Sequence, residues 1–289
     1  MGAFKFLLAS FVALILWVQW VEPHWFRIRR VTVRLKKPLQ KPLTILHLSD
    51  FHFTKNHFHL ERFFNRLAKL EPDLILVTGD LIDSIEGIGP CVANLRKLKP
   101  RQGIYAVFGN HDYRNYPPLG VWLHLFTGKD TFTWRPESDL TQLKEALAHA
   151  GVNVLFNQNV TLSFSNGSEL VLVGLDDPVS GRADVERAFT GTRNGAVRIA
   201  LTHSPMTFPS LSERGVDLAF AGHTHGGQIR IPGLGPLAVL RSRVSPIIDS
   251  TAEYGFHGIV SRGMGAQAIT RMRLFCRPEA ILVRVEGSG

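Results

Sequence analysis

Polar clusters rich in metal-binding side chains follow short apolar runs at five points of the chain. The clusters contain Asp50 and His52, Asp80, Asn110 to Asp112, His203, and His223 with His225. Single residues of these types often only form turns, but five such clusters in series indicate a shared site. Carboxylate, imidazole and amide ligands without a thiolate suit Mn, Fe or Zn in a catalytic centre better than a structural zinc site. The residues therefore predict metal-dependent chemistry.

The spacing within two clusters would aim paired side chains at one ion. Asp50 and His52 lie two residues apart on an extended segment, so both point to the same side. His223 and His225 share that spacing, beside glycines that permit a tight turn: Gly222, Gly226 and Gly227.

The elements that must position these clusters are short strands and amphipathic helices. Runs rich in Ile, Leu and Val predict buried strands at residues 43–49, 74–78, 104–108, 170–175, 197–202 and 216–221. Apolar residues at helical spacing predict helices around 60–67 and 140–147. The alternation predicts a layered α/β fold with a covered sheet. The clusters then follow the carboxyl ends of strands, where open α/β sheets usually bind ligands.

Five sequence blocks, taken together, resemble a known family. HLSDFH, TGDL, GNHD, LTHSP and GHTHGG, in this order, are similar to the signature blocks of the calcineurin-like metallophosphoesterases, and the likeness extends over about residues 43–285. The resemblance implies a four-layer α-β-β-α sandwich and a centre of two divalent ions. Mn²⁺ is the expected metal, with Fe and Zn as alternatives.

Carried onto matching positions, the resemblance assigns seven metal ligands. The first ion would be held by Asp50, His52 and His225, the second by Asn110, His203 and His223, and Asp80 would bridge the two. Two adjacent cations can clamp phosphate oxygens and lower the pKa of a bridging water, which favours hydrolysis of an anionic ester.

Two further residues of the GNHD block have expected catalytic roles. By resemblance, His111 contacts the phosphate together with Asn110 and protonates the leaving oxygen, which requires a group that titrates near neutrality. Asp112 would hold the His111 imidazole in its useful orientation and raise its pKa. The alternatives are a structural histidine and a helix-capping aspartate.

The first 26 residues are expected to form a membrane anchor. Residues 6–21 are almost entirely apolar and match the shorter helices that cross a hydrocarbon core. The absence of a clear basic start and of a small-residue cleavage site favours an uncleaved helix over a signal peptide. A helix lying in one leaflet is the alternative.

Basic residues follow the apolar run, so residues 27–42 are expected to be a basic juxtamembrane linker. Their position predicts that the catalytic domain, residues 43–289, lies on the cytoplasmic face of a bacterial inner membrane. The same cations could bind anionic lipid headgroups.

Composition and charge narrow the class further. With 289 residues, 45% of them hydrophobic and only two cysteines, disorder and a disulfide-stapled fold are excluded. A net charge of +9 favours anionic partners. Much of that charge lies beside the anchor and no nucleic-acid module is recognised, so a nuclease is disfavoured and no nucleic-acid partner is expected. Every ligand position is filled, which disfavours a non-catalytic scaffold. The oligomeric state stays open.

The substrate is expected to be a phosphorylated, lipid-linked small molecule. An aromatic insertion at residues 113–139, with Trp122 and Trp134, suggests a flap against lipid, and a satellite core is the alternative. The closing segment, YGFHGIVSRGMG and then RMRLFCRPEAILVRV, resembles a membrane-anchored branch, the YkuE-like or YaeI-like phosphodiesterases. That branch includes enzymes that convert UDP-2,3-diacylglucosamine to lipid X and UMP in lipid A biosynthesis. A broad-specificity or phospholipid phosphodiesterase is the alternative.

Overall fold

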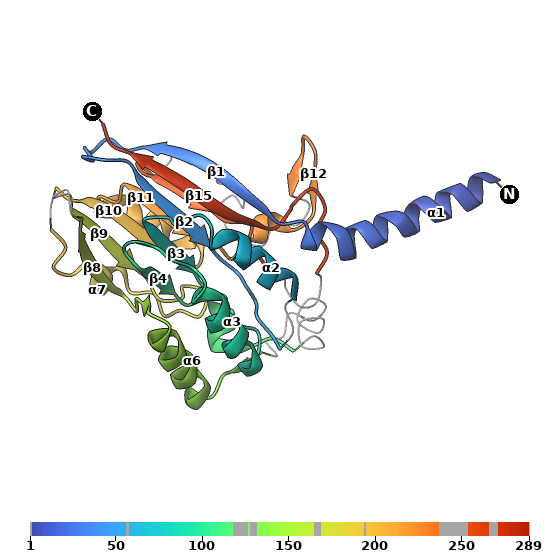
Figure 1. Ribbon diagram of the computed structural model, residues 1–289, viewed down its shortest axis with the longest axis horizontal. Helices are drawn as coiled ribbons and strands as arrows, with labels where there is room; N and C mark the ends of the chain where they lie inside the picture. Colours follow the sequence, from blue (N-terminus) through green and yellow to red (C-terminus); the bar gives the residue numbers. More distant parts are fainter. Residues whose placement is uncertain are drawn as a thin grey trace.

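Two facing β-sheets, covered by helices on their outer sides, form the body of the protein. In the computed structural model the described residues are 2–55, 58–117, 127, 132–164, 169–193, 195–236, 254–265 and 271–288. A single helix at the N-terminus projects away from this body (Figure 1). The expected four-layer α-β-β-α architecture is confirmed.

The first sheet has six strands in the order β1-β15-β2-β3-β4-β7. Their bounds are β1 (Arg27–Arg34), β15 (Glu279–Glu286), β2 (Leu43–Leu48), β3 (Leu74–Thr78), β4 (Ile104–Val107) and β7 (Val152–Val154). Strands β2, β3, β4 and β7 run parallel, β15 runs antiparallel to β2, and β1 runs parallel to β15.

Strand β1 replaces most of the basic linker that was expected between the anchor and the domain. It pairs with β15 over eight residues, from Arg27 opposite Glu279 to Arg34 opposite Glu286. Two of its arginines form ion pairs with the buried Glu279 carboxylate, Arg27 at 2.5 Å and Arg29 at 3.3 Å. This strand was not expected because the segment is rich in arginine. A strand at the edge of a sheet can carry such charged side chains, since they remain at the surface.

The second sheet has five strands in the order β14-β11-β10-β9-β8. Their bounds are β14 (His257–Val260), β11 (Leu218–Ala221), β10 (Val197–Leu201), β9 (Glu169–Gly174) and β8 (Gln158–Ser163). Side chains of both sheets meet in one core that includes Ile45, Leu76, Leu172, Ile199 and Phe220. Strands covered on both faces have continuous apolar sequences, which explains why the runs were recognisable.

Helices cover the outer face of each sheet. Helices α2 (Phe58–Leu67), α3 (Ile88–Leu95) and α6 (Glu137–His149) pack against the first sheet. The shorter helices α7 (Val185–Phe189) and α8 (Phe208–Leu211) pack against the second. Helices α2 and α6 confirm the two amphipathic segments that the sequence predicted.

The N-terminal segment is helical from Gly2 to His24, and it is long and apolar enough to cross a membrane by length and composition. It comprises α1 (Gly2–Leu16), in which no residue is buried, the π-helical turn η1 (Trp17–Val21) and the 3₁₀ turn η2 (Glu22–His24). Only its end packs on the body, where the Val18 carbonyl accepts a hydrogen bond from the Arg273 amide at 3.0 Å.

Candidate metal centre

The five polar clusters meet where the carboxyl ends of strands from both sheets come together. Asp50 and His52 follow β2, Asp80 follows β3 and Asn110 follows β4, all in the first sheet. The second sheet contributes His203 after β10 and the pair His223 and His225 after β11. Because β2, β3 and β4 are parallel, as are β10 and β11, each sheet delivers its ligands at one edge.

Asp50, His52 and His225 form the first ligand group. Their nearest ligand atoms all lie within 4.8 Å of one another, and all three residues are buried. The Nε2 atoms of His52 and His225 are 3.1 Å apart, and His225 Nε2 is 3.7 Å from Asp50 Oδ1. This is the trio that the family resemblance assigned to the first ion.

Asp80, His203 and His223 form the second group. His203 Nε2 lies 3.3 Å from Asp80 Oδ2 and 3.2 Å from Asn110 Oδ1. The same Asp80 oxygen is 3.7 Å from His52 Nε2, so Asp80 lies between the two groups. The structure therefore brings all seven expected ligands together, with Asp80 at the position of a bridge.

Hydrogen bonds to the outer ring nitrogens orient two imidazoles for metal binding. The Thr78 carbonyl can only accept, so His203 Nδ1 donates to it at 2.8 Å. His52 Nδ1 donates to the Asp83 carboxylate at 2.8 Å. In both rings this leaves the Nε2 lone pair directed at the centre, which is the usual arrangement around metal-binding histidines.

The backbone at the ligands adopts a conformation that side chains normally avoid. Five ligands have positive φ angles: Asp50 at 52°, His52 at 51°, Asp80 at 52°, His223 at 67° and His225 at 48°. Residues other than glycine rarely occupy this region, and such strain gathers at functional sites. The surrounding fold thus holds these side chains where local preference would not place them.

Two glycines permit the close approach of the ligand loops. Gly79 has φ +83°, and a Cβ there would lie 2.6 Å from His203 Nδ1 and 2.7 Å from the Gly109 nitrogen. A Cβ on Gly109 would lie 2.6 Å from the Asp80 nitrogen and 2.7 Å from His203 Cε1. Any larger residue would push Asp80 and His203 apart, which explains the glycine in the GD and GN pairs.

The electrostatics of the centre favour bound cations. Burial would raise the pKa of Asp80, but the His203 and His111 imidazoles outweigh it and hold that pKa well below its ordinary value. Burial opposes protonation of His203, yet Asp80 raises its pKa to about 10. Buried carboxylates here need positive charge, and divalent ions would supply it in place of protons. The donor set and its charge therefore fit two divalent ions.

His111 lies against the centre, with a ring nitrogen within 4.8 Å of ligand atoms of His52 and Asp80, and it has further partners of its own. Its Nδ1 is 2.7 Å from Asp83 Oδ1, so the carboxylate that orients His52 also orients His111. The Tyr116 ring stacks on the His111 ring with a centroid distance of 4.0 Å. The Tyr116 hydroxyl accepts a hydrogen bond of 2.7 Å from Asn110 Nδ2. Asp83 and Tyr116 therefore belong to the site, although neither was expected from the sequence.

Asp112 does not have the contacts that were expected of it. Its carboxylate accepts hydrogen bonds from the backbone amides of Leu81, Ile82 and Gly109, at 2.8, 3.1 and 2.9 Å. Burial and the nearby Asp80 raise the pKa of Asp112 to about 7. Asp112 thus stabilises the loops that carry Asp80 and Asn110. Asp83, not Asp112, orients His111. The available signal was the carboxylate three residues after Asp80 in TGDLID.

The aromatic insertion is described only at its base. Strands β5 (Arg114–Asn115) and β6 (Thr133–Trp134) pair antiparallel, and Arg114 stacks over the exposed Trp134 ring at 4.4 Å. The expected flap rested also on Trp122, which lies outside the described residues.

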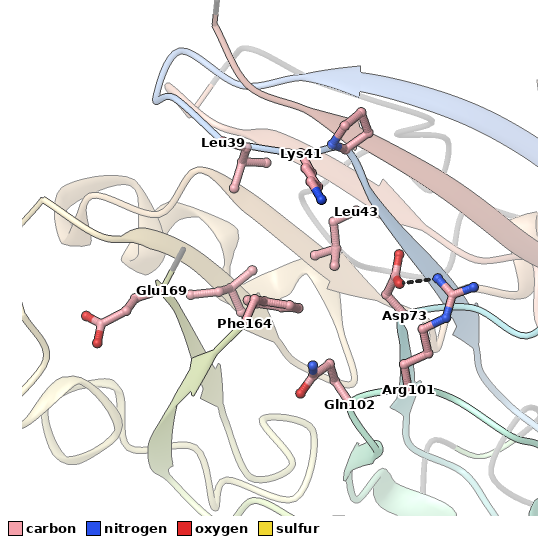
Figure 2. Close-up of a pocket in the computed structure, with 10 residues that line it drawn as sticks. Leu39, Lys41, Leu43, Asp73, Arg101, Gln102, Phe164 and Glu169 are labelled. Atoms are coloured by element: carbon pink, nitrogen blue, oxygen red, sulfur yellow. Dashed lines mark hydrogen bonds and ion pairs between the residues drawn. The ribbon is translucent and has the colours of Figure 1, made fainter. Parts of the chain in front are cut away.

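A cavity of about 310 Å³ lies at the opposite ends of the strands (Figure 2). Its lining includes Leu43 at the start of β2 and Leu170 near the start of β9, away from the metal loops. Asp73 in this cavity accepts a hydrogen bond of 2.8 Å from Arg101 (Figure 2). It also accepts one of 2.6 Å from the Thr44 hydroxyl. Its carboxylate is thus already occupied.

Comparison with known proteins agrees with this geometry. The family model described as calcineurin-like phosphoesterase matches residues 43–227, which hold every ligand of both groups. The chain belongs to the calcineurin-like phosphoesterase family. It is accordingly an enzyme, a metal-dependent hydrolase of phosphoester bonds.

Three relatives show the range of the family around this chain. An uncharacterized metallophosphoesterase, YkoQ of Bacillus subtilis, is 33% identical over 68% of this chain, which spans 65% of YkoQ. The UDP-2,3-diacylglucosamine pyrophosphatase LpxG of Chlamydia muridarum is 27% identical over 93% of this chain and 92% of LpxG. The phosphodiesterase YaeI of Escherichia coli is 29% identical, again over 93% and 92%.

Proposed function

We propose that this enzyme hydrolyses a lipid-linked phosphodiester or pyrophosphate at a membrane, with UDP-2,3-diacylglucosamine as the first candidate substrate. The observation that carries the proposal is the combination of a cluster of metal-ligating side chains with an apolar N-terminal helix whose end packs on the catalytic body. The likeness to LpxG and YaeI supports it, because it extends over 93% of this chain in both cases.

The chemistry divides between the ions and the chain. Two divalent ions, with Mn²⁺ as the proposed metal, would supply charge neutralisation and an activated water when bound. The chain's own groups would hold them, with Asp80 between the two ligand groups. His111, held through Nδ1 by Asp83, keeps Nε2 available to protonate the leaving oxygen. Asn110 and His111 lie side by side, so both can contact the phosphate.

The proposed location is the cytoplasmic face of a bacterial inner membrane, with the helix retained. Val18, Glu22 and Pro23 at the end of the helix are buried. Glu22 Oε1 accepts a hydrogen bond of 2.6 Å from the Cys276 amide. Removal of the whole segment would break these contacts, which favours an uncleaved anchor. The arginines after the helix favour the cytoplasmic side.

The test is hydrolysis of UDP-2,3-diacylglucosamine by the full chain in detergent with Mn²⁺. Bis-p-nitrophenyl phosphate is run in parallel, and Asp80→Ala is the control for both. Release of UMP that disappears in Asp80→Ala would establish the pyrophosphatase activity. Turnover of the artificial diester alone would reject this substrate and favour a phosphodiesterase of broad specificity or one that acts on phospholipids.

A further inference from the structure

A second cavity, of about 350 Å³, lies where the N-terminal helix joins the catalytic domain. Its volume is at the lower end of the range of about 300–1,000 Å³ that is usual for ligand pockets. Most of its wall is apolar, with contributions from three separate parts of the chain: Trp20, Pro23 and Phe26, then Phe58 and Leu60, and finally Met264. Trp20 and Phe58 are 66% and 59% exposed, so the cavity has an apolar, accessible mouth.

The polar part of the lining is neutral or basic. His24 and His59 stack with ring centroids 4.0 Å apart, and Arg271 also lines the cavity. None of the described residues that line the cavity is acidic. Outside the lining, the Arg62 guanidinium lies 4.2 Å from the centre of the Phe58 ring. A ligand that combines an apolar chain with an anionic group would match both parts of this surface.

The inner wall of the cavity is the backbone beside the metal ligands. The Met264 amide donates to the Ser49 carbonyl at 3.0 Å, and the Gly265 amide donates to the Asp50 carbonyl at 2.6 Å. Asp50 is itself a ligand of the first group. The cavity therefore lies directly behind the first metal loop, between that loop and the membrane helix.

We infer that this cavity holds an acyl chain of the membrane-embedded substrate while its phosphate group reaches the metal centre. The inference rests on the proposed function and adds the site that selects a lipid. If Gly2–His24 spans the bilayer, then Trp20 lies near the end of the span, at the depth where tryptophan is favoured. A lipid could then keep its chain in apolar surroundings on its way from the bilayer to the metals.

Two tryptophans at this boundary provide a matched test. Trp20 lines the cavity, whereas Trp25 is also exposed, at 49%, but does not line it. Trp20→Ser and Phe58→Asp should each lower kcat/KM for UDP-2,3-diacylglucosamine by about tenfold, the usual effect of losing an aromatic anchor. Both should leave turnover of bis-p-nitrophenyl phosphate unchanged, and Trp25→Ser should leave both activities unchanged. Equal losses from Trp20→Ser and Trp25→Ser would overturn the inference, because they would indicate general contact with the membrane surface.

A labelling experiment separates failure of the cavity from failure of the substrate. The full chain is placed in nanodiscs containing phosphatidic acid with a diazirine at the end of one acyl chain, irradiated and mapped by mass spectrometry. Labels at residues 19–26, 58–60 or 264–265 that weaken in Phe58→Asp would support an acyl site even if no diacylglucosamine substrate is cleaved. Labels confined to residues 2–16 would refute it, because they would report only lipids around the helix.

Discussion

Asp83 is the residue whose replacement best tests the roles assigned to His52 and His111. The Oδ1 atom of this half-buried residue accepts hydrogen bonds from His52 Nδ1 at 2.8 Å and from His111 Nδ1 at 2.7 Å. Burial raises the pKa of this carboxyl, but the two imidazoles outweigh that effect and keep it ionised. Asp83→Asn removes the charge while it preserves size, so it weakens both bonds without opening a cavity.

The two bonds predict two separable losses. A hydrogen bond to a charged group contributes about 1.5–3 kcal/mol. For His111 this corresponds to a loss of about 10- to 100-fold in kcat. For His52 we expect metal affinity to fall by about 10- to 100-fold, as is usual when a partner of a metal-binding histidine is removed. Saturating Mn²⁺ should restore full metal occupancy but should not restore the kcat that is lost through His111.

The assay compares two diesters that differ in leaving group. An alkyl leaving group needs a proton from His111, whereas p-nitrophenolate departs without one. At saturating Mn²⁺, Asp83→Asn should therefore lose kcat on the alkyl diester and keep most of its kcat on bis-p-nitrophenyl phosphate. Equal loss of kcat on both esters with normal bound metal would show that Asp83 does not act through His111.

Asp112→Asn is the comparison variant for this experiment. Asp112 accepts three backbone hydrogen bonds, and an amide would leave the Gly109 N–H without an acceptor. We expect the free energy of unfolding to fall by about 1–3 kcal/mol, with no selective loss on the alkyl ester. A selective loss in Asp112→Asn would return the orienting role to Asp112.

Three further outcomes are expected. Burial, with a smaller contribution from Arg29, lowers the pKa of His47 from 6.5 to about 3. The stability that comes from keeping this ring neutral is complete above pH 6.5 and is lost as the pH falls. Between pH 7 and pH 5 the free energy of unfolding, measured by chemical denaturation, should therefore fall by about 2 kcal/mol more in the wild type than in His47→Gln. Gly109→Ala should release metal, measured by elemental mass spectrometry, because its Cβ would displace Asp80; full metal content would contradict this. Deleting residues 2–16 should leave the thermal unfolding temperature and the turnover of soluble diester unchanged. Deleting residues 2–24 should lower the unfolding temperature, because it also removes Val18 and Glu22. Equal unfolding temperatures for the two deletions would count against a structural role for the end of the helix.

The fold and the meeting of the polar clusters could be predicted from the sequence because both depend on local pattern. Strands buried on both faces are continuous apolar runs, and each ligand follows such a run directly. The run before Asp80 was predicted at 74–78 and forms β3 over the same residues. The ligands could be grouped because the five blocks resemble one family as an ordered set.

Contacts between side chains of separate loops could not be predicted from local sequence pattern. Asp83 and His111 are 28 residues apart, and only the crossing of two loops brings their side chains to 2.7 Å. Asp112 is adjacent to His111 in the chain, yet its side chain points to three backbone amides instead. Strand β1 was missed for a related reason, because its arginines suggested a linker and its partner strand lies more than 240 residues away in the sequence.

The end of the helix and the metal centre are joined through one buried arginine. Arg273 is fully buried, its amide donates to the Val18 carbonyl, and its guanidinium donates to the Gly265 carbonyl at 2.6 Å and lies 3.5 Å from His225 Nδ1. A buried guanidinium is costly unless its donors are paired, so this arrangement persists only while the helix end, the Gly265 loop and the His225 loop keep their places. The N-terminal helix therefore also has a structural role in the catalytic domain. Its last turns form part of the structure that positions His225, so the apolar N-terminal helix and the phosphoesterase site share one wall.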